Sequence, residues 1–120
     1  MFSPSVAMTG RVISFREKSG FKQAVINTSS DIKKAEPGMS IAINGVCLTA
    51  SSFNNGREFI ADISSETADK TTLGKIKPGE PVNVEFPVSA DTFLSGHIMQ
   101  GHVDTTGSVM GLEKKQGNTV

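Results

Sequence analysis

Residues 47–63, "CLTASSFNNGREFIADI", hold the pattern that decides the fold. Two short runs, 47–53 and 57–63, each have one apolar face, and they flank the turn sequence Asn-Asn-Gly at 54–56. Alternation of apolar and polar side chains is typical of a half-buried strand. Asparagine and glycine accept the positive φ that tight turns require. The stretch therefore predicts a β-hairpin.

Strands of the same kind recur on both sides of this hairpin. Residues 10–15 and 21–26 predict a second hairpin, and residues 40–45 and 82–86 each alternate apolar and polar side chains. Six short strands separated by turns predict an all-β fold, an antiparallel barrel.

Two segments are predicted to form short helices, 29–36 and 64–74, and each begins with a pair of serines able to cap a helix N-terminus. Gly74 is the expected end of the second helix. Each segment is followed by a Pro-Gly pair, at 37–38 and 78–79. Proline followed by glycine suits the two central positions of a type II turn, so both pairs predict chain reversals.

Composition excludes several classes of function. Among the 120 residues, 12 basic and 12 acidic side chains cancel, so no net field attracts nucleic acid or an anionic membrane. The chain has no Trp and no Tyr, which removes the usual platforms for base stacking. No run approaches the roughly 18–20 apolar residues that a membrane span needs, and the N-terminal run lacks the basic lead of a signal peptide. With a single cysteine, the cytoplasm is the expected compartment.

A repeat links the two ends of the chain. The segment "MTGRVIS" at 8–14 returns as "TTGSVMG" at 105–111, 97 residues later. The match indicates either duplication or coincidence in stretches rich in Thr, Gly and Val. If it is duplication, residues 1–98 form one barrel, and 99–120 form an interbarrel loop and the first strand of a truncated or swapped second barrel.

Four motifs together point to one family: "INGVCLT" (43–49), "DISSET" (62–67), "TTLGKIKPGEPVNVE" (71–85) and "SGHIMQGHVDTTG" (95–107). The chain resembles the N-terminal half of the riboflavin synthase and lumazine protein family. The resemblance implies a six-stranded Greek-key barrel that binds lumazine, with two barrels per full-length chain and a homotrimeric assembly.

The resemblance also implies an activity. Two molecules of 6,7-dimethyl-8-ribityllumazine are dismutated: one gives a four-carbon unit to the other, which yields riboflavin and 5-amino-6-ribitylaminopyrimidinedione. The reaction needs no metal and no organic cofactor. Each site is built from the N-terminal barrel of one subunit and the C-terminal barrel of another, so this chain would supply half of it. Self-association of the chain is expected, as a dimer in which two identical barrels imitate the missing pair.

Cys47 has two interpretations. A free cysteine is commonly a small buried apolar residue, but Cys47 and Thr49 lie on one strand face, and the resemblance places both against the ring of the ligand. Val46 adjoins them in the same motif. Ser40 is either a solvated turn hydroxyl or a further contact to the ring or the ribityl chain.

The end of the 57–63 strand carries the second group of candidates. Backbone groups of Asp62, Ile63 and Ser64 could read the urea-like edge of a flat heterocycle. Glu66 either complements the helix dipole or, with Thr67, hydrogen-bonds the ribityl chain.

His97 and His102 are the only histidines in the chain, and each follows a glycine. Their spacing does not suit a metal pair on a strand or a helix, so no metal is expected. They either bond loop carbonyls or transfer protons at neutral pH, for which imidazole is suited. The resemblance places them at the assembled site.

The opening of the family pattern falls on Met8, Thr9 and Gly10, which are the remaining candidates for substrate contact. The candidate catalytic residues are Cys47, Ser40, His97 and His102. Two functions stay open, a riboflavin synthase and a non-catalytic lumazine or flavin binder of the antenna type. The three residues Cys47, His97 and His102 favour the enzyme lineage.

Overall fold

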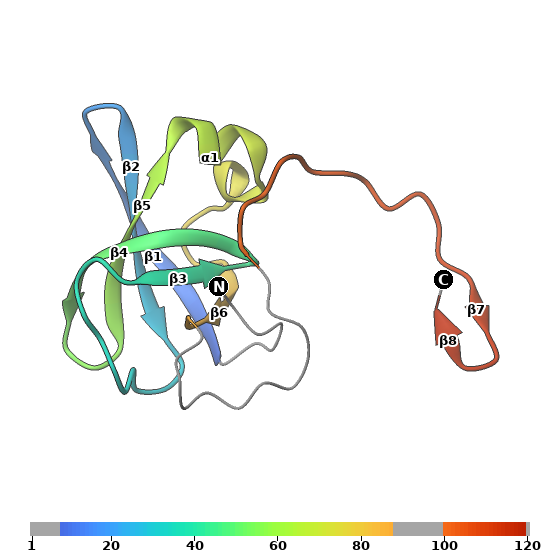
Figure 1. Cartoon of the computed structure of the whole chain (residues 1–120), viewed down its shortest axis with the longest axis horizontal. Helices are drawn as coiled ribbons and strands as arrows, with labels where there is room; N and C mark the ends of the chain where they lie inside the picture. Colours follow the sequence, from blue (N-terminus) through green and yellow to red (C-terminus); the bar gives the residue numbers. More distant parts are fainter. Residues whose placement is uncertain (1–7, 88–99, 120) are drawn as a thin grey trace.

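The computed structural model describes residues 8–87 and 100–119 and contains a closed antiparallel barrel in the strand order β1-β2-β5-β4-β3-β6 (Figure 1). The strands are β1 (Met8–Lys18), β2 (Phe21–Thr28), β3 (Ser40–Ile43), β4 (Val46–Asn54), β5 (Glu58–Ser64) and β6 (Pro81–Glu85). The consecutive strands β3, β4 and β5 are neighbours in the sheet, and β2, which precedes them in the chain, lies beside β5. This arrangement is a Greek key. The predicted all-β barrel is confirmed.

Closure depends on β1, which pairs with two neighbours. Its residues Met8–Arg11 pair with β6, and Gly10–Lys18 pair with β2. Gly10 lies where the two ladders overlap, and a Cβ there would stand 3.0 Å from the Asn27 carbonyl oxygen and 3.2 Å from Ile26 Cγ2. A bulge between Val12 and Ser14 bends β1 past this point.

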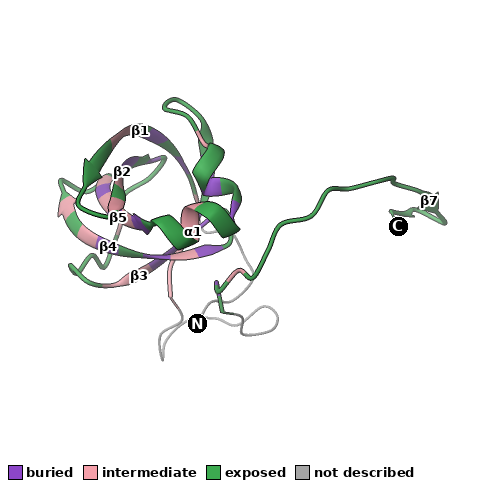
Figure 2. Ribbon diagram, turned by 90° about the horizontal axis from the view of Figure 1, so that it is seen from above, coloured by how far each residue is buried: buried purple, intermediate pink, exposed green. Residues whose placement is uncertain are grey.

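Buried residues alternate with more exposed ones along the barrel strands (Figure 2). The side chains of the buried residues form the core cluster inside the barrel. The largest fully buried side chains are Phe59, Ile26, Ile41, Ile43 and Val84. Each such burial contributes about 1.5–3 kcal/mol to folding.

The turns follow from glycine and asparagine. Asn44 (φ 50°) and Gly45 (φ 80°) connect β3 to β4 as a tight hairpin turn. Both predicted Pro-Gly reversals are confirmed: Gly38 and Gly79 each have a φ of 92°, and hydrogen bonds close them from Met39 N–H to the Glu36 carbonyl and from Glu80 N–H to the Lys77 carbonyl.

The helix predicted over 29–36 is wrong. The segment consists of bends and irregular backbone, because its backbone donors bond to distant residues instead of along a helix. Ser29 N–H donates to the Thr9 carbonyl, and Ile32 N–H donates to the Gly56 carbonyl. An ion pair of 2.8 Å between Arg57 and Asp31 also ties this segment to the turn between β4 and β5.

The second predicted helix is present in two pieces, α1 (Ser65–Lys70) and the 3₁₀ turn η1 (Thr72–Lys75). Gly74 lies inside η1 rather than ending α1. A Cβ at Gly74 would stand 2.3 Å from the Ala68 carbonyl oxygen, so glycine permits η1 to fold back closely on α1.

Residues 100–103 lie against the barrel, and the C-terminal segment then extends away from it (Figure 1). Residues 100–113 have no regular secondary structure, and a small hairpin follows, β7 (Lys114–Lys115) and β8 (Asn118–Thr119). Residues 105–111, which repeat the sequence of 8–14, form no strand, and the predicted boundary at residue 98 lies outside the described residues. Among those residues, no helix is long and apolar enough to cross a membrane.

The β7–β8 hairpin extends the sequence repeat, because its strand pairs match those at the tip of the β1–β2 hairpin. The pairs Glu17↔Lys22 and Lys18↔Phe21 of the β1–β2 hairpin correspond, 97 residues later, to Lys114↔Thr119 and Lys115↔Asn118. The division into a barrel and the start of a second one stays a prediction.

The closure point generates a test. The substitution Gly10→Ala is expected to destabilise the chain by about 1–3 kcal/mol, because the added methyl overpacks the junction of β1, β2 and β6. Urea unfolding followed by circular dichroism measures the change. The matched control is Gly107→Ala at the equivalent repeat position, where nothing lies within 4 Å of the added methyl, so a change below about 0.5 kcal/mol is expected. Equal effects of the two substitutions would contradict this account of closure.

Candidate functional site

The helix α1 is fixed at the end of β5 by hydroxyl groups. The Ser64 side chain caps it by accepting a hydrogen bond of 3.1 Å from Thr67 N–H. At the other end, Thr71 Oγ1 donates to the Thr67 carbonyl (2.7 Å) and accepts from Leu73 N–H (3.2 Å). Thr71 is itself buried, so α1 is held as a wall beside the barrel.

Next to this wall, β4 and β5 part. The two strands pair as far as Thr49↔Asp62. Continuing that register would place Cys47 opposite Ser64, but Ser64 is already the cap of α1. Instead, Cys47 N–H donates a hydrogen bond of 2.8 Å to the carbonyl of Gly101. The first residues of β4 are thus paired with the segment 100–103 rather than with β5.

A cavity of about 140 Å³ lies in this opening. It brings together five residues singled out from the sequence, which come from β4, α1 and the C-terminal segment: Val46, Cys47, Glu66, Thr67 and His102. Four further residues complete the lining: Lys70, Thr71, Gly101 and Val103. None of these four was assigned a role from the sequence, although Thr71 lies in the motif at 71–85 and Gly101 and Val103 lie in the motif at 95–107.

Glu66 and Lys70 form an ion pair of 2.7 Å along α1, with both side chains largely exposed. The hydrogen bond from Lys70, followed by its positive charge, holds the pKa of Glu66 below the ordinary value for a carboxyl group. The hydrogen bond to Glu66 and its negative charge raise the pKa of Lys70, and the negative charge of Asp104 raises it further. Both groups are therefore charged at neutral pH, and the carboxylate is available as an acceptor for hydroxyl groups.

A row of polar side chains crosses the outer face of the barrel. Ser40, Thr49 and Asp62 are direct partners across β3, β4 and β5. The row continues to Gln23 on β2, whose Nε2 donates to Asp62 Oδ1 at 2.9 Å. Cys47 is two residues from Thr49 on β4 and therefore lies on the same face. Sequence reasoning missed Gln23, although a polar residue in an apolar strand was the available signal.

Several candidates have side chains that point elsewhere. Val46 and Ile63 are buried in the core, so Ile63 offers the cavity region only its backbone. Met8 packs against the core, and its register partners place it on the far side of β6 and β3 from Val46. Thr9 is exposed, and Gly10 sits at the closure point. The structure does not bring Met8, Thr9 and Gly10 to the cavity, and their role in binding stays a prediction.

His102 is exposed, with its Nδ1 3.2 Å from Gln100 Oε1. His97 lies outside the described residues. Within residues 8–87 and 100–119, no group of three or more His, Cys, Asp or Glu side chains could hold a metal ion.

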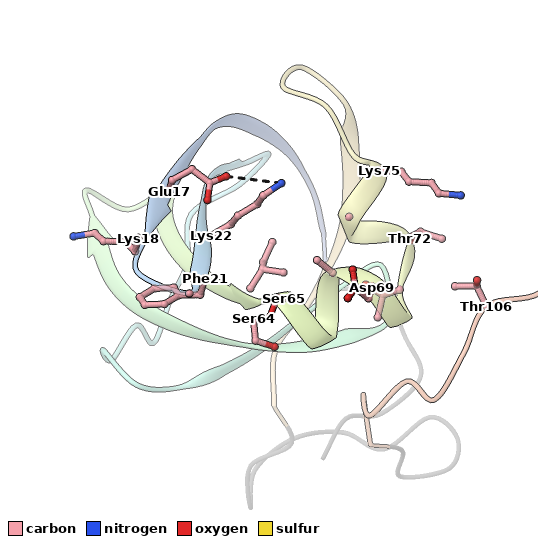
Figure 3. Close-up of a pocket in the computed structure, with 15 residues that line it drawn as sticks. Glu17, Lys18, Phe21, Lys22, Ser64, Ser65, Asp69, Thr72, Lys75 and Thr106 are labelled. Atoms are coloured by element: carbon pink, nitrogen blue, oxygen red, sulfur yellow. Dashed lines mark ion pairs between the residues drawn. The ribbon is translucent and has the colours of Figure 1, made fainter.

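A larger and more open hollow of about 610 Å³ lies on the other side of α1 (Figure 3). Of the candidate residues, only Ile63 and Ser64 line it. Its remaining walls come from the β1–β2 hairpin, the α1–η1 region and Thr106 of the C-terminal segment. Its charged groups have mixed sign: Glu17, Lys18, Lys22, Asp69 and Lys75. The chemistry of the predicted site is therefore concentrated in the smaller cavity, and we take that cavity as the candidate site.

Comparison with known proteins decides the family. Residues 4–87 match the family model described as the lumazine binding domain. The chain belongs to this family.

Relatives of this lumazine binding domain include riboflavin synthases. The riboflavin synthase of Actinobacillus pleuropneumoniae is 34% identical over 119 residues, which are 99% of this chain and 55% of that protein. The riboflavin synthase of Meyerozyma guilliermondii is 36% identical over all of this chain and 53% of its own length. The chain spans about half the length of these relatives.

Solved structures agree on the fold. A crystal structure of LumP complexed with riboflavin matches 97% of this chain with a TM-score of 0.74 at 19% identity, over 62% of that chain. LumP complexed with 6,7-dimethyl-8-(1'-D-ribityl) lumazine matches 97% of this chain with a TM-score of 0.68, also at 19% identity, over 61% of its length.

The placement of Cys47 on the cavity wall can be tested by alkylation. Because its side chain is partly exposed, iodoacetamide is expected to modify the native chain, which mass spectrometry detects as a single adduct on the only cysteine. The urea-unfolded chain is the control for full reactivity. Modification that requires unfolding would instead make Cys47 a core residue.

Proposed function

We propose that this chain supplies the N-terminal half of a riboflavin synthase site and binds 6,7-dimethyl-8-ribityllumazine and riboflavin. The observation that supports it most directly is the cavity that gathers Cys47, Glu66, Thr67 and His102 in a chain whose relatives are riboflavin synthases. The residues suit a ligand with one flat polar ring and one polyhydroxyl chain.

The two parts of the ligand meet different chemistry. The ring lies along the start of β4, where Cys47 and Thr49 share a face and Ser40 stands beside Thr49. The β4–β5 pairing ends at Thr49 and Asp62, so the backbone groups that face the β4 side beyond Asp62, at Ile63 or Ser64, can read the ring edge. The ribityl hydroxyls extend toward α1, where the charged Glu66 and the hydroxyl of Thr67 accept and donate hydrogen bonds.

Proton transfer is assigned to imidazole. Dismutation begins when a proton leaves the C7 methyl group of one lumazine, and a group that exchanges protons near neutral pH suits this step. His102 lines the cavity, and His97 precedes it in the same motif. Cys47 acts as a hydrogen-bonding partner or nucleophile toward the ring. No metal ion or organic cofactor enters this scheme, and the lone free thiol is compatible with a cytoplasmic protein.

The size of the cavity favours a half-site. Pockets that enclose a small-molecule ligand have roughly 300–1,000 Å³, whereas the cavity beside Cys47 has about 140 Å³. A ligand of roughly 23 heavy atoms, which would bind with on the order of micromolar affinity, would lie across the opening with one face uncovered. A second barrel would cover that face and bring the second lumazine molecule into reach.

An antenna-type protein is the second candidate function. Such a protein binds lumazine or flavin without turning it over, and LumP complexed with riboflavin has the same fold. Retention of Cys47, His97 and His102 supports the enzyme lineage over this alternative.

The deciding experiment is a titration of the chain with riboflavin and with 6,7-dimethyl-8-ribityllumazine. Ligand fluorescence measures binding, and absorbance measures flavin formed. We expect saturable binding with little or no turnover, because a half-site lacks the second barrel. Turnover at a rate typical of a whole enzyme, about 1–10³ s⁻¹, would contradict the half-site, and no binding of either ligand would contradict the function itself.

Self-association has its own test. Two copies that face each other across the open cavities would imitate the pair of barrels, so we expect a dimer in sedimentation equilibrium, strengthened by saturating riboflavin. Full-length relatives are expected to be trimers. A monomeric mass at high protein concentration, with and without ligand, would rule the dimer out.

A further inference from the structure

The segment 100–103 lies against the open edge of β4 at the position that β5 leaves vacant. The segment is joined to the barrel by the hydrogen bond of 2.8 Å from Cys47 N–H to the Gly101 carbonyl. Gly101 is buried although its neighbours Gln100 and His102 are exposed. Val103 packs against the core cluster. Within the described part of the chain, a hydrogen bond at Gly101 and an apolar contact at Val103 therefore hold the segment on either side of His102.

Close approach at this point requires glycine. A Cβ on Gly101 would stand 2.6 Å from the backbone nitrogen of Cys47, 2.8 Å from its Cβ and 3.0 Å from its Cα. All three atoms belong to the backbone of β4 or are fixed directly to it, so no side-chain rotation relieves the clash. A retreat of the segment that relieves this clash would lengthen and weaken the hydrogen bond of 2.8 Å to Cys47.

We infer that Gly101 is a positioning residue for the ligand site: it docks the segment 100–103 on Cys47 and thereby forms one wall of the cavity. The inference rests on the proposed function for the identity of the ligand. Gly101 itself supplies no reacting group. It acts through Cys47, whose backbone it anchors, and through His102 and Val103, which it brings into the cavity lining.

Docking and ligand binding are then linked. A ligand that contacts the cavity wall binds more tightly when the segment is docked, and by reciprocity it stabilises the docked segment by the same free energy.

Exchange of the Cys47 amide hydrogen reports docking directly, because the carbonyl of Gly101 accepts its hydrogen bond. The Ala50 amide is an internal reference on the same strand, since it donates to the Met39 carbonyl at 2.9 Å and does not touch the segment.

The experiment compares Gly101→Ala with Gly111→Ala in the full chain. Gly111 lies in the same C-terminal segment, and nothing stands within 4 Å of a Cβ added there. For Gly101→Ala we expect at least tenfold weaker binding of riboflavin and at least tenfold faster exchange of the Cys47 amide. Ala50 exchange and the circular dichroism spectrum should stay unchanged, because the six barrel strands do not include Gly101. Gly111→Ala should match the original chain in all four measurements.

Three results would overturn the inference. Unchanged Cys47 exchange in Gly101→Ala would mean that glycine does not dock the segment. Faster exchange with unchanged riboflavin affinity would mean that docking does not shape the site. If Gly101→Ala fails to fold, the original chain decides: riboflavin should slow exchange at Cys47 more than at Ala50, and equal effects would contradict the linkage. Failure of the original chain to bind riboflavin or lumazine would instead refute the proposed function, while Cys47 exchange would still report docking.

Discussion

The double pairing of β1 is the constraint on which the rest of the molecule depends. One end of the strand hydrogen-bonds β6 and the remainder hydrogen-bonds β2, so the sheet closes on itself. Each of the six barrel strands therefore has a neighbour on both sides. Gly10 permits the crossing without crowding, because an added Cβ would stand only 3.0–3.3 Å from atoms of Asn27, Ile26 and Val84. In a closed barrel, unsatisfied backbone groups are found only where two neighbouring strands part. The candidate site lies at such a place.

That parting has a local cause. Ser64 ends β5 and caps α1 with its side chain, so it cannot also continue the ladder opposite Cys47. The capped helix places Glu66 and Thr67 beside the start of β4, and the segment 100–103 occupies the vacant edge. Three elements far apart in sequence thus form one cavity. The same helix separates this cavity from the larger hollow lined by Glu17, Lys22 and Asp69.

The sequence predicted the parts of the fold that local chemistry controls. Strand alternation and the Pro-Gly turns located the six strands, and a serine cap located α1. The segment 29–36 was predicted wrongly because its serines and charges suit a helix, whereas its hydrogen bonds go to Thr9 and Gly56, which sequence spacing does not reveal. For the site, motif resemblance placed Cys47, Glu66, Thr67 and His102 in one group. It could not show that Met8 points into the core or that Gly101 contacts Cys47, since both depend on the three-dimensional packing of distant segments.

Barrel closure also has a consequence for folding kinetics. The pairing of Met8 with Val84 joins residues on the first and last strands of the barrel, and β2 pairs with β5 across the intervening β3–β4 hairpin. Chains dominated by such distant pairings fold slowly, typically in milliseconds to seconds, because loop entropy is lost before the contacts form. During synthesis, β1 must wait for β6 to leave the ribosome before its second ladder can form. Until then, the backbone groups of Met8–Arg11 that face β6 form an unpaired edge that can associate with other strands.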